Sequence, residues 1–187
     1  KTGIRKSKER GIMKKRKLGT KVIILMVVFS LLIIVSTCIA VVVRYREDAL
    51  ERSRGQAFAY AKTAAAYIDG DRIEGYLTTL QKDEYYEQVE DFLNASQDYS
   101  DLKYYYVYVP YEDDLVYIWD ANEEEGACEL GDHEDYMKGG KEVSFAAFRK
   151  EPEEHVLVSV DETYGFITSV VAPVYNSNGD PVALVGV

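Results

Sequence analysis

The longest apolar stretch of the chain runs from Val22 to Val43 and contains no charged residue. As an α-helix rising ~1.5 Å per residue it would extend about 33 Å, which is enough to cross a hydrocarbon core of roughly 30 Å. A helix also satisfies its own backbone hydrogen bonds, as lipid requires. The pattern therefore predicts a transmembrane helix over residues 22–43.

Helical periodicity continues in the more polar sequence that follows. Residues 44–68 lack proline, are rich in alanine, and place apolar side chains at mostly helical spacing, namely Leu50, Ala57, Ala61, Ala64, Ala65 and Ile68. We expect a juxtamembrane helix that leaves the bilayer without a break, and its small side chains favour a parallel homodimer. Asp69 and Gly70 are predicted to end it, and Asp71 with Glu74 is typical of a capping box that starts another short helix.

The rest of the chain predicts a second helix and then a sheet. Residues 83–99 place Tyr86, Val89, Phe92 and Leu93 along one helical stripe. From Lys103 onwards, aromatic and β-branched runs between turn residues predict antiparallel strands. The expected strands cover residues 103–109, 115–119, 143–148, 156–160, 166–175 and 182–187, with a loop and a short helix over 126–141. The first two and the last two strands should form hairpins.

Helices followed by strands predict an α+β domain. We expect the N-terminal transmembrane helix to continue into a long helix that packs on one face of an antiparallel sheet. Residues 69–187 are enough for a single domain with one core. The sequence starts without Met and ends at Val187 inside a strand-like run, so we expect it to be part of a longer chain, truncated at its last strand.

The two sides of the apolar stretch differ strongly in charge. Residues 1–21 contain ten Lys and Arg and one Glu, whereas residues 56–187 contain eight basic and 28 acidic residues. Because basic flanks are retained in the cytoplasm, we expect a basic cytoplasmic segment over 1–21 and an extracytoplasmic location in the cell membrane for everything after about residue 45. So acidic a domain disfavours nucleic acid as a partner.

Three classes of protein that also carry an N-terminal apolar stretch fit the sequence less well. A cleaved signal peptide has a shorter apolar core that ends in small residues, whereas residues 41–43 are valines followed by Arg44. A lipoprotein signal ending at Cys38 would place Thr37 before the cysteine, and the apolar run continues past it. A pilin-like helix would carry a glutamate near its start, and residues 22–43 contain none.

At this point the chain resembles the extracytoplasmic Cache family of bacterial sensor domains, which have a PAS-like fold. The resemblance covers residues 44–187. It rests on the membrane-continuous helix, the Tyr-Val-Tyr-Val and Val-Tyr-Ile-Trp-Asp strands, Tyr164-Gly165, and above all the closing residues 172–175 and 179–187. A single sheet fits the single-module form of the family. The resemblance implies a ligand pocket between the sheet and the 126–148 excursion, and a cytoplasmic output such as a chemotaxis, kinase, cyclase or phosphatase module.

Aromatic residues supply the candidate pocket. Alternation along a strand places Tyr104, Tyr106 and Tyr108 on one face and Tyr105, Val107 and Val109 on the other. By the same alternation Leu115, Tyr117 and Trp119 are expected to share a face. The 16 tyrosines of the chain exceed what a core can easily satisfy, since each buried hydroxyl needs a partner. The candidate ligand-binding residues are Tyr106, Tyr108, Tyr117, Trp119, Asp120, Tyr136, Phe148 and Arg149.

Two of these candidates favour different ligands. Arg149 would hold a carboxylate through paired hydrogen bonds, whereas Asp120 within an aromatic cage would select an amine. A small organic acid, an amino acid and an amine therefore all remain open.

No constellation for catalysis, a metal or a cofactor emerges. His133 and His155 lack a nucleophile at motif spacing, and Cys128 lacks a CxxC partner. Cys38 lies in the apolar stretch, so we expect no disulfide. The acids Glu123, Glu124, Glu125 and Glu129 are typical of a solvated loop, with a cation site as the less favoured alternative.

The sequence thus predicts a non-enzymatic input domain that senses a small molecule for a transmembrane receptor. A ligand would act by its different affinity for two arrangements of the juxtamembrane helices. Two alternatives are a membrane-anchored structural or partner-binding protein and, less favoured, a surface-anchored enzyme.

Overall fold

The computed structural model describes the whole chain except residues 1, 101, 122–125, 150–155 and 162–164. The chain forms two compact units, Lys1–Ala49 and Leu50–Val187, which are described separately. Helix α1 (Thr2–Tyr67) begins in the first unit and ends in the second. Within the first unit the apolar side chains of residues 22–43 are exposed, and this stretch is long and apolar enough to cross a membrane. The expected apolar helix is therefore present.

The second unit continues with three short helical elements after α1. They are η1 (Gly70–Arg72), α2 (Ile73–Thr79) and α3 (Glu84–Asp98). Helix α3 matches the predicted amphipathic helix, and its Tyr86, Val89 and Leu93 are buried. The predicted capping box is wrong, because Asp69 and not Asp71 caps the first of these elements by accepting a hydrogen bond from the Asp71 amide.

The strands form an antiparallel sheet. They are β1 (Tyr106–Pro110), β2 (Leu115–Asp120), β3 (His133–Glu134), β4 (Val156–Asp161), β5 (Gly165–Tyr175) and β6 (Pro181–Gly186). Their order is β3-β2-β1-β6-β5-β4, so that β1 and β6 pair at the centre and each belongs to a hairpin. Both predicted hairpins and the α+β class are confirmed.

One predicted strand is a helix. Residues 143–148 belong to α4 (Gly140–Phe148), and the short helix predicted within 126–141 is replaced by a loop with the two-residue strand β3. Gly139 precedes α4 with φ +84°, a left-handed conformation that glycine adopts easily. Val143, Ala146 and Ala147 then lie at helical spacing and turn towards the sheet, with both alanines buried.

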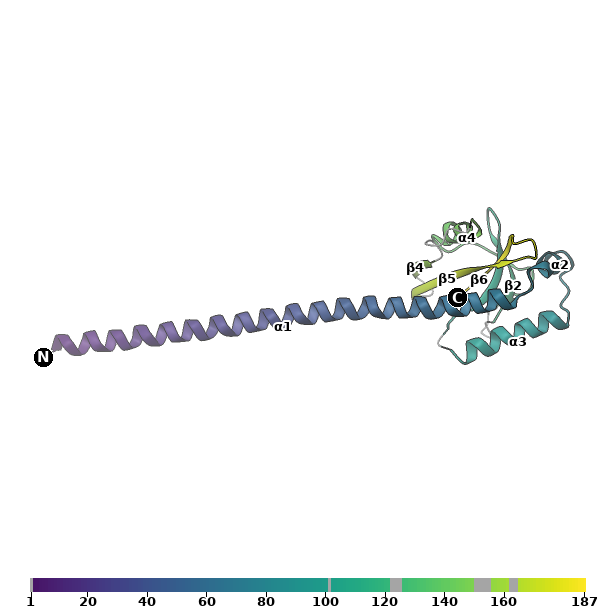
Figure 1. The fold of residues 1–187 in the computed structure, drawn as a ribbon. Helices are drawn as coiled ribbons and strands as arrows, with labels where there is room; N and C mark the ends of the chain where they lie inside the picture. The colour runs from purple at the N-terminus through teal and green to yellow at the C-terminus, as the bar shows by residue number, and fades with distance from the viewer. Residues whose placement is uncertain (1, 101, 122–125, 150–155, 162–164) are drawn as a thin grey trace. The chain divides into compact units, whose positions relative to one another are not determined.

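Two apolar clusters lie on opposite faces of the sheet, and α3 and α4 lie on opposite sides of it (Figure 1). The helix-side cluster joins α1, α2 and α3 to one face through Ala57, Ala61, Ala64, Tyr86, Val89, Tyr105, Val107 and Trp119, among others. The cavity-side cluster joins α4 to the other face through Tyr108, Leu115, Tyr117, Ala147, Val171 and Leu184. The expected cover of one sheet face by the long helix is thus observed.

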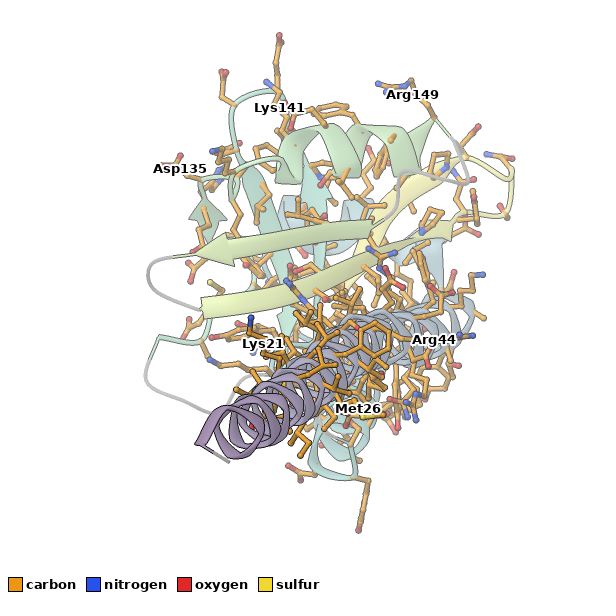
Figure 2. All side chains as sticks on the ribbon, turned by 90° about the vertical axis from the view of Figure 1, so that its left-hand side faces the viewer. Lys21, Met26, Arg44, Asp135, Lys141 and Arg149 are labelled. Carbon is orange, nitrogen blue, oxygen red and sulfur yellow. The ribbon has the colours of Figure 1, made fainter. Side chains whose placement is uncertain are left out.

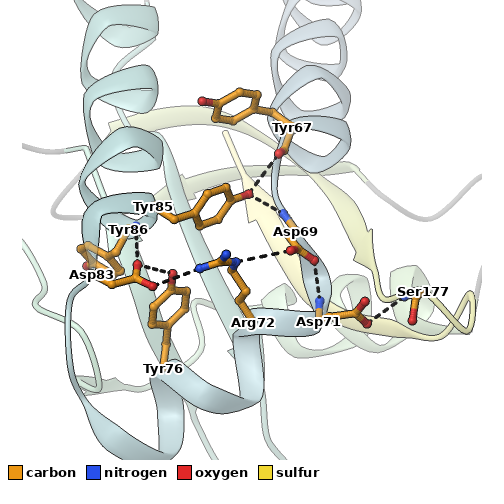
Figure 3. Close-up of polar contacts among 9 residues, drawn as sticks. All are labelled: Tyr67, Asp69, Asp71, Arg72, Tyr76, Asp83, Tyr85, Tyr86 and Ser177. Atoms are coloured by element: carbon orange, nitrogen blue, oxygen red, sulfur yellow. Dashed lines mark hydrogen bonds and ion pairs between the residues drawn. The ribbon is translucent and has the colours of Figure 1, made fainter.

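A polar network ties the end of α1 to α2 and α3 (Figure 3). The Tyr85 hydroxyl accepts a hydrogen bond from the Asp69 amide at 2.7 Å and donates to the Tyr67 carbonyl at 3.2 Å. Asp83 caps α3 by accepting from the Tyr86 amide, and it also accepts from the Tyr76 hydroxyl at 2.8 Å. These bonds fix the position at which the chain leaves α1.

Candidate ligand-binding site

A large cavity lies between the sheet and the excursion that contains α4. Its volume is about 850 Å³, within the usual range for small-molecule sites. The sheet, the 126–137 loop and α4 supply Tyr106, Tyr108, Leu115, Tyr117, Asp120, Gly126, Cys128, Glu134, Tyr136, Val143 and Ser144. The wall also includes Ser53, Gln56, Ala57 and Tyr60 of α1 and residues 98–100 and 102–104.

A β-bulge decides which side chains of β2 face this cavity. Val107 pairs with Trp119 while Tyr108 pairs with Tyr117, so the register shifts and Ile118 is the extra residue. Tyr117 consequently lies in the cavity-side cluster, whereas Ile118 and Trp119 both lie in the helix-side cluster. Alternation resumes at Asp120, which lines the cavity.

Because of this bulge, the prediction that Trp119 lines the pocket is wrong. Its ring is 1% exposed and stacks on Tyr86 with centroids 4.9 Å apart. Its indole N–H donates to the Tyr86 carbonyl at 3.1 Å. Trp119 is therefore a core residue on the opposite face of the sheet, and strict alternation from Tyr117 failed because of the inserted residue.

Alternation along β1 is confirmed. Tyr105 and Val107 are buried in the helix-side cluster, while Tyr106 and Tyr108 turn to the cavity side. The Tyr106 ring is 5.6 Å from the Tyr108 ring and 5.5 Å from the Tyr117 ring, centroid to centroid, in tilted arrangements. We call these three rings the tyrosine cluster.

Gly186 makes room for the central ring of the tyrosine cluster. It pairs with Tyr106 across β1 and β6, and a Cβ atom at Gly186 would lie 2.5 Å from the Tyr106 ring. The ring therefore lies directly over the glycine backbone. Any larger side chain at this position would have to push Tyr106 away from its present place in the cavity wall.

The tyrosine hydroxyls around the cavity differ in how they are satisfied. Ser144 Oγ donates to the Gly140 carbonyl, so the Tyr108 hydroxyl is the donor in its 2.7 Å bond to Ser144. The Tyr117 hydroxyl donates to Glu134 Oε2 at 2.7 Å. Tyr136, also a predicted site residue, donates to the Tyr111 carbonyl.

Tyr106 differs from these three tyrosines. In the part of the chain that the structure describes, its hydroxyl has no hydrogen-bond partner, although the residue is half-buried and lines the cavity. The hydroxyl is accessible from the open volume of the cavity, so water or a ligand can form a hydrogen bond with it there.

Burial raises the pKa of these phenols further above physiological pH. It raises the pKa of Tyr106 to about 12, with further contributions from Glu134 and Asp120, and it raises the pKa of Tyr136 to about 12. Burial likewise raises the pKa of Tyr108 and Tyr117 above the ordinary value for a phenol. These four phenols are therefore neutral, and of the four only the Tyr106 hydroxyl is not donated to another described residue.

Two predicted site residues lie outside this wall. Phe148 is half-buried at the end of α4 and packs against the cavity-side cluster, but it does not line the cavity. Arg149 follows the last residue of α4 and is exposed, at the outer end of that helix (Figure 2). Both residues were predicted to line the pocket on the assumption that residues 143–148 form a strand. Because these residues belong to helix α4, neither Phe148 nor Arg149 lines the cavity.

Several wall residues escaped prediction from the sequence. Glu134 and Ser144 satisfy tyrosine hydroxyls, and Cys128 lies in the wall with a pKa raised to about 11, chiefly by burial. Gln56 and Tyr60 enter from α1. The excess of tyrosines gave a signal for Glu134 and Ser144, since each buried hydroxyl requires an acceptor nearby.

Neither a metal cluster nor a catalytic arrangement appears among the described residues. No group of three His, Cys, Asp or Glu residues there is placed to hold a metal ion. His133 Nδ1 lies 2.6 Å from Asp114 Oδ2 beside a smaller hollow near Tyr111. His155 and the acids Glu123–Glu125 fall outside the described residues.

Comparison with protein-family models finds no match for this sequence, and comparison with curated proteins finds none either. The chemistry of the cavity itself is therefore the basis for assigning a function.

Proposed function

We propose that residues 69–187 form the extracytoplasmic, Cache-like input domain of a bacterial transmembrane receptor and that its cavity binds a small molecule. The observation that carries this proposal is the cavity of about 850 Å³ lined by the tyrosine cluster, with the Tyr106 hydroxyl unpartnered among the described residues. Its place between the sheet and the α4 excursion is the place that the resemblance implies. The accessible Tyr106 hydroxyl could donate a hydrogen bond to a bound ligand or accept one from it.

The proposed orientation rests on charge. The basic segment before the apolar stretch would stay in the cytoplasm, and residues after about 45 would be extracytoplasmic. Insertion of the chain into bacterial inner-membrane vesicles followed by protease treatment tests this. Protection of the acidic domain inside right-side-out vesicles would contradict the orientation.

The cavity offers a direct route to α1. Ser53, Gln56 and Tyr60 of this helix are part of the wall, and the Tyr105 hydroxyl donates to the Tyr60 carbonyl at 2.9 Å. A ligand in the cavity would therefore touch the helix that continues into the apolar stretch. Its differential affinity for two positions of that helix would bias the receptor.

A parallel homodimer remains part of the proposal, with a changed surface. Ala57 and Ala61 of the small-residue stripe are 6% and 0% exposed because they pack in the helix-side cluster, so neither is accessible to a second copy. Exposed small residues of this helical segment include Gly55, Ala59, Thr63 and Ala66. Cysteine at Ala59 should crosslink across a dimer, whereas cysteine at Ala61 should not; equal crosslinking at both would contradict this surface.

Thermal melting of the full chain in lipid nanodiscs, against a library of organic acids, amino acids and amines, tests the sensor function. A ligand at 100 times its Kd should stabilise the domain by about 2.7 kcal/mol. A shift that is lost in Tyr106→Phe would support the cavity as the site. A flat screen on a well-folded protein would favour the anchored structural or partner-binding alternative.

A further inference from the structure

We infer that the cavity selects a small organic cation, an ammonium compound without a carboxylate, over an organic acid. This inference rests on the proposed function, because it names the class of ligand for the same site. It decides between the two ligand classes that Asp120 and Arg149 favour separately.

The charges in the cavity wall are predominantly negative. Among the described residues that line it, Asp98, Asp120, Glu134 and Asp135 are acidic and Lys103 alone is basic. Lys103 Nζ lies 5.3 Å from the centre of the Tyr104 ring. Arg149, the residue that would clamp a carboxylate, is not part of the wall. Asp120 is half-buried, whereas Asp98, Glu134, Asp135 and Lys103 are exposed and partly screened by water, so a carboxylate in the cavity would still meet more negative than positive side chains.

Glu134 is the carboxylate best placed to hold a cation. Its Oε2 accepts a hydrogen bond from the neutral Tyr117 hydroxyl, and it forms no ion pair with any residue that the structure describes. Its negative charge reaches into the cavity, since it contributes to the raised pKa of Tyr106, Tyr117 and Cys128. Glu134 is an exposed residue of β3 and no described residue forms an ion pair with it, so its carboxylate is available to a positively charged ligand.

The tyrosine cluster adds a second cation-selective element. Aromatic faces attract ammonium groups within about 6 Å of the ring centre. The Tyr108 and Tyr117 rings pack against the Tyr106 ring at 5.6 and 5.5 Å, and all three residues line the cavity. The unpartnered Tyr106 hydroxyl can accept an N–H from a primary ammonium group or accept a ligand hydroxyl. Ring faces, carboxylates and this hydroxyl together match an ammonium compound.

Cys128 provides a reporter inside the site. It lines the cavity and is half-buried, and the other cysteine, Cys38, lies in the apolar stretch. In the full chain carrying Cys38→Ser, in nanodiscs, the rate of alkylation of Cys128 by a maleimide measures access to the cavity. A ligand that occupies the cavity slows this rate, and the concentration dependence of the protection gives its Kd.

The probes are two organic cations and two carboxylates. Choline and ethanolamine are cations without a carboxylate, whereas glycine betaine is choline's analogue with a carboxylate in place of the alcohol, and succinate is an organic acid. We expect choline or ethanolamine to protect Cys128, and betaine and succinate to fail. Choline and ethanolamine together separate a preference for quaternary ammonium from one for primary ammonium.

Variants that neutralise single carboxylates test which of them causes the preference for a cation. Glu134→Gln should weaken protection by the cation about 10-fold or more, because the carboxylate charge that attracts the cation is removed, and Asp120→Asn should weaken it as well. The controls are Asp91→Asn, an exposed acid on α3 away from the cavity, and Arg149→Ala, and neither should change the Kd. Unchanged binding in both Glu134→Gln and Asp120→Asn would overturn the inference.

The two proposals fail in different ways. Protection by succinate or betaine but by neither cation would overturn the cation selectivity and leave the small-molecule sensor standing. Protection by none of the four probes, together with a flat melting screen, would overturn the cation selectivity and the sensor function alike.

Discussion

Tyrosines on the two faces of the sheet differ in what their hydroxyl groups contact. On the helix side, Tyr86 donates to the Ile118 carbonyl and Tyr105 to the Tyr60 carbonyl, so each hydroxyl is consumed by the fold. On the cavity side, Tyr106 has no partner among the described residues, and Tyr117 bonds to a carboxylate at the cavity wall. Tyr108 and Tyr136 also line the cavity, but their hydroxyls bond to Ser144 and to the Tyr111 carbonyl, so the free hydroxyl sets Tyr106 apart from these neighbours.

The largest expected effect comes from removing the central aromatic side chain of the helix side. Trp119→Ala deletes a ring that stacks on Tyr86 and packs edge-on against Tyr76. We expect a loss of about 3–5 kcal/mol in the free energy of unfolding, measured by urea denaturation of the full chain in nanodiscs. A well-folded Trp119→Ala protein that has lost only ligand binding would place Trp119 in the site after all.

Alanine substitutions at two glycines, Gly70 and Gly186, should have the next largest effects, and the two should differ. A Cβ atom at Gly70 would lie 2.4 Å from the backbone oxygen of Tyr175, which cannot move aside, so Gly70→Ala should cost about 1–3 kcal/mol. At Gly186 the obstacle is the end of the Tyr106 side chain, which can swing away. Gly186→Ala should therefore cost less stability than Gly70→Ala but alter cavity access, measured by alkylation of Cys128.

The control for these substitutions is Gly75→Ala in α2. No atom lies within 4 Å of the added Cβ, so the change should stabilise the domain by about 0.5–1 kcal/mol through helix propensity. Equal stability losses in Gly70→Ala and Gly186→Ala would argue against a movable Tyr106 ring.

The Asp83 cap tests whether the helix side can be weakened without disturbing the cavity. Asp83→Ala removes the N-cap of α3 and the acceptor of the Tyr76 hydroxyl, and we expect a loss of about 0.5–2 kcal/mol by urea denaturation. The ion pair of Asp83 with Arg72 at 3.0 Å is half-exposed and should add little. Asp91→Ala in the middle of the same helix is the control. A change in the rate of Cys128 alkylation in Asp83→Ala would contradict the expectation that the cavity is undisturbed and would show that the two faces of the sheet are coupled.

The smallest expected effect is the pH dependence of that cap. The Tyr86 amide, the Tyr76 hydroxyl and Arg72 lower the pKa of Asp83 below its ordinary value of 3.8. A lowered pKa means that the charged form stabilises the fold above about pH 3.8 and that this contribution disappears as the pH falls through the lower folded value. Unfolding free energies of wild type and Asp83→Asn should differ at pH 6 and converge in acid; a constant difference would contradict this.

Periodicity was sufficient for most of the fold. The stripe of α3, both hairpins and the alternation of Tyr105 to Tyr108 were predictable because each element satisfies one regular period. Helix α4 was not, since Val143, Ala146 and Ala147 sit in a short apolar run that suits a strand as well as a helix. Only the left-handed Gly139 before it and the sheet beneath it decide the outcome.

The site was predictable to the extent that its strands are regular. Tyr106, Tyr108, Tyr117, Asp120 and Tyr136 all line the cavity as expected. Trp119 does not, because a β-bulge adds one residue and leaves no mark in the hydrophobic pattern. Glu134 was missed because its role depends on a long-range hydrogen bond to Tyr117, which no local spacing encodes.

The most direct test of the account compares Tyr86→Phe with Tyr106→Phe in the full chain. For each variant, the free energy of unfolding and the melting shift produced by the best-stabilising compound of the library are measured together. We predict that Tyr86→Phe loses about 1–3 kcal/mol, because a buried acceptor is left without its donor, and keeps its ligand response. Tyr106→Phe should keep its stability within about 0.5 kcal/mol and lose the response. The reverse pattern, or equal behaviour of the two variants, would contradict the assignment of one face to structure and the other to ligand binding.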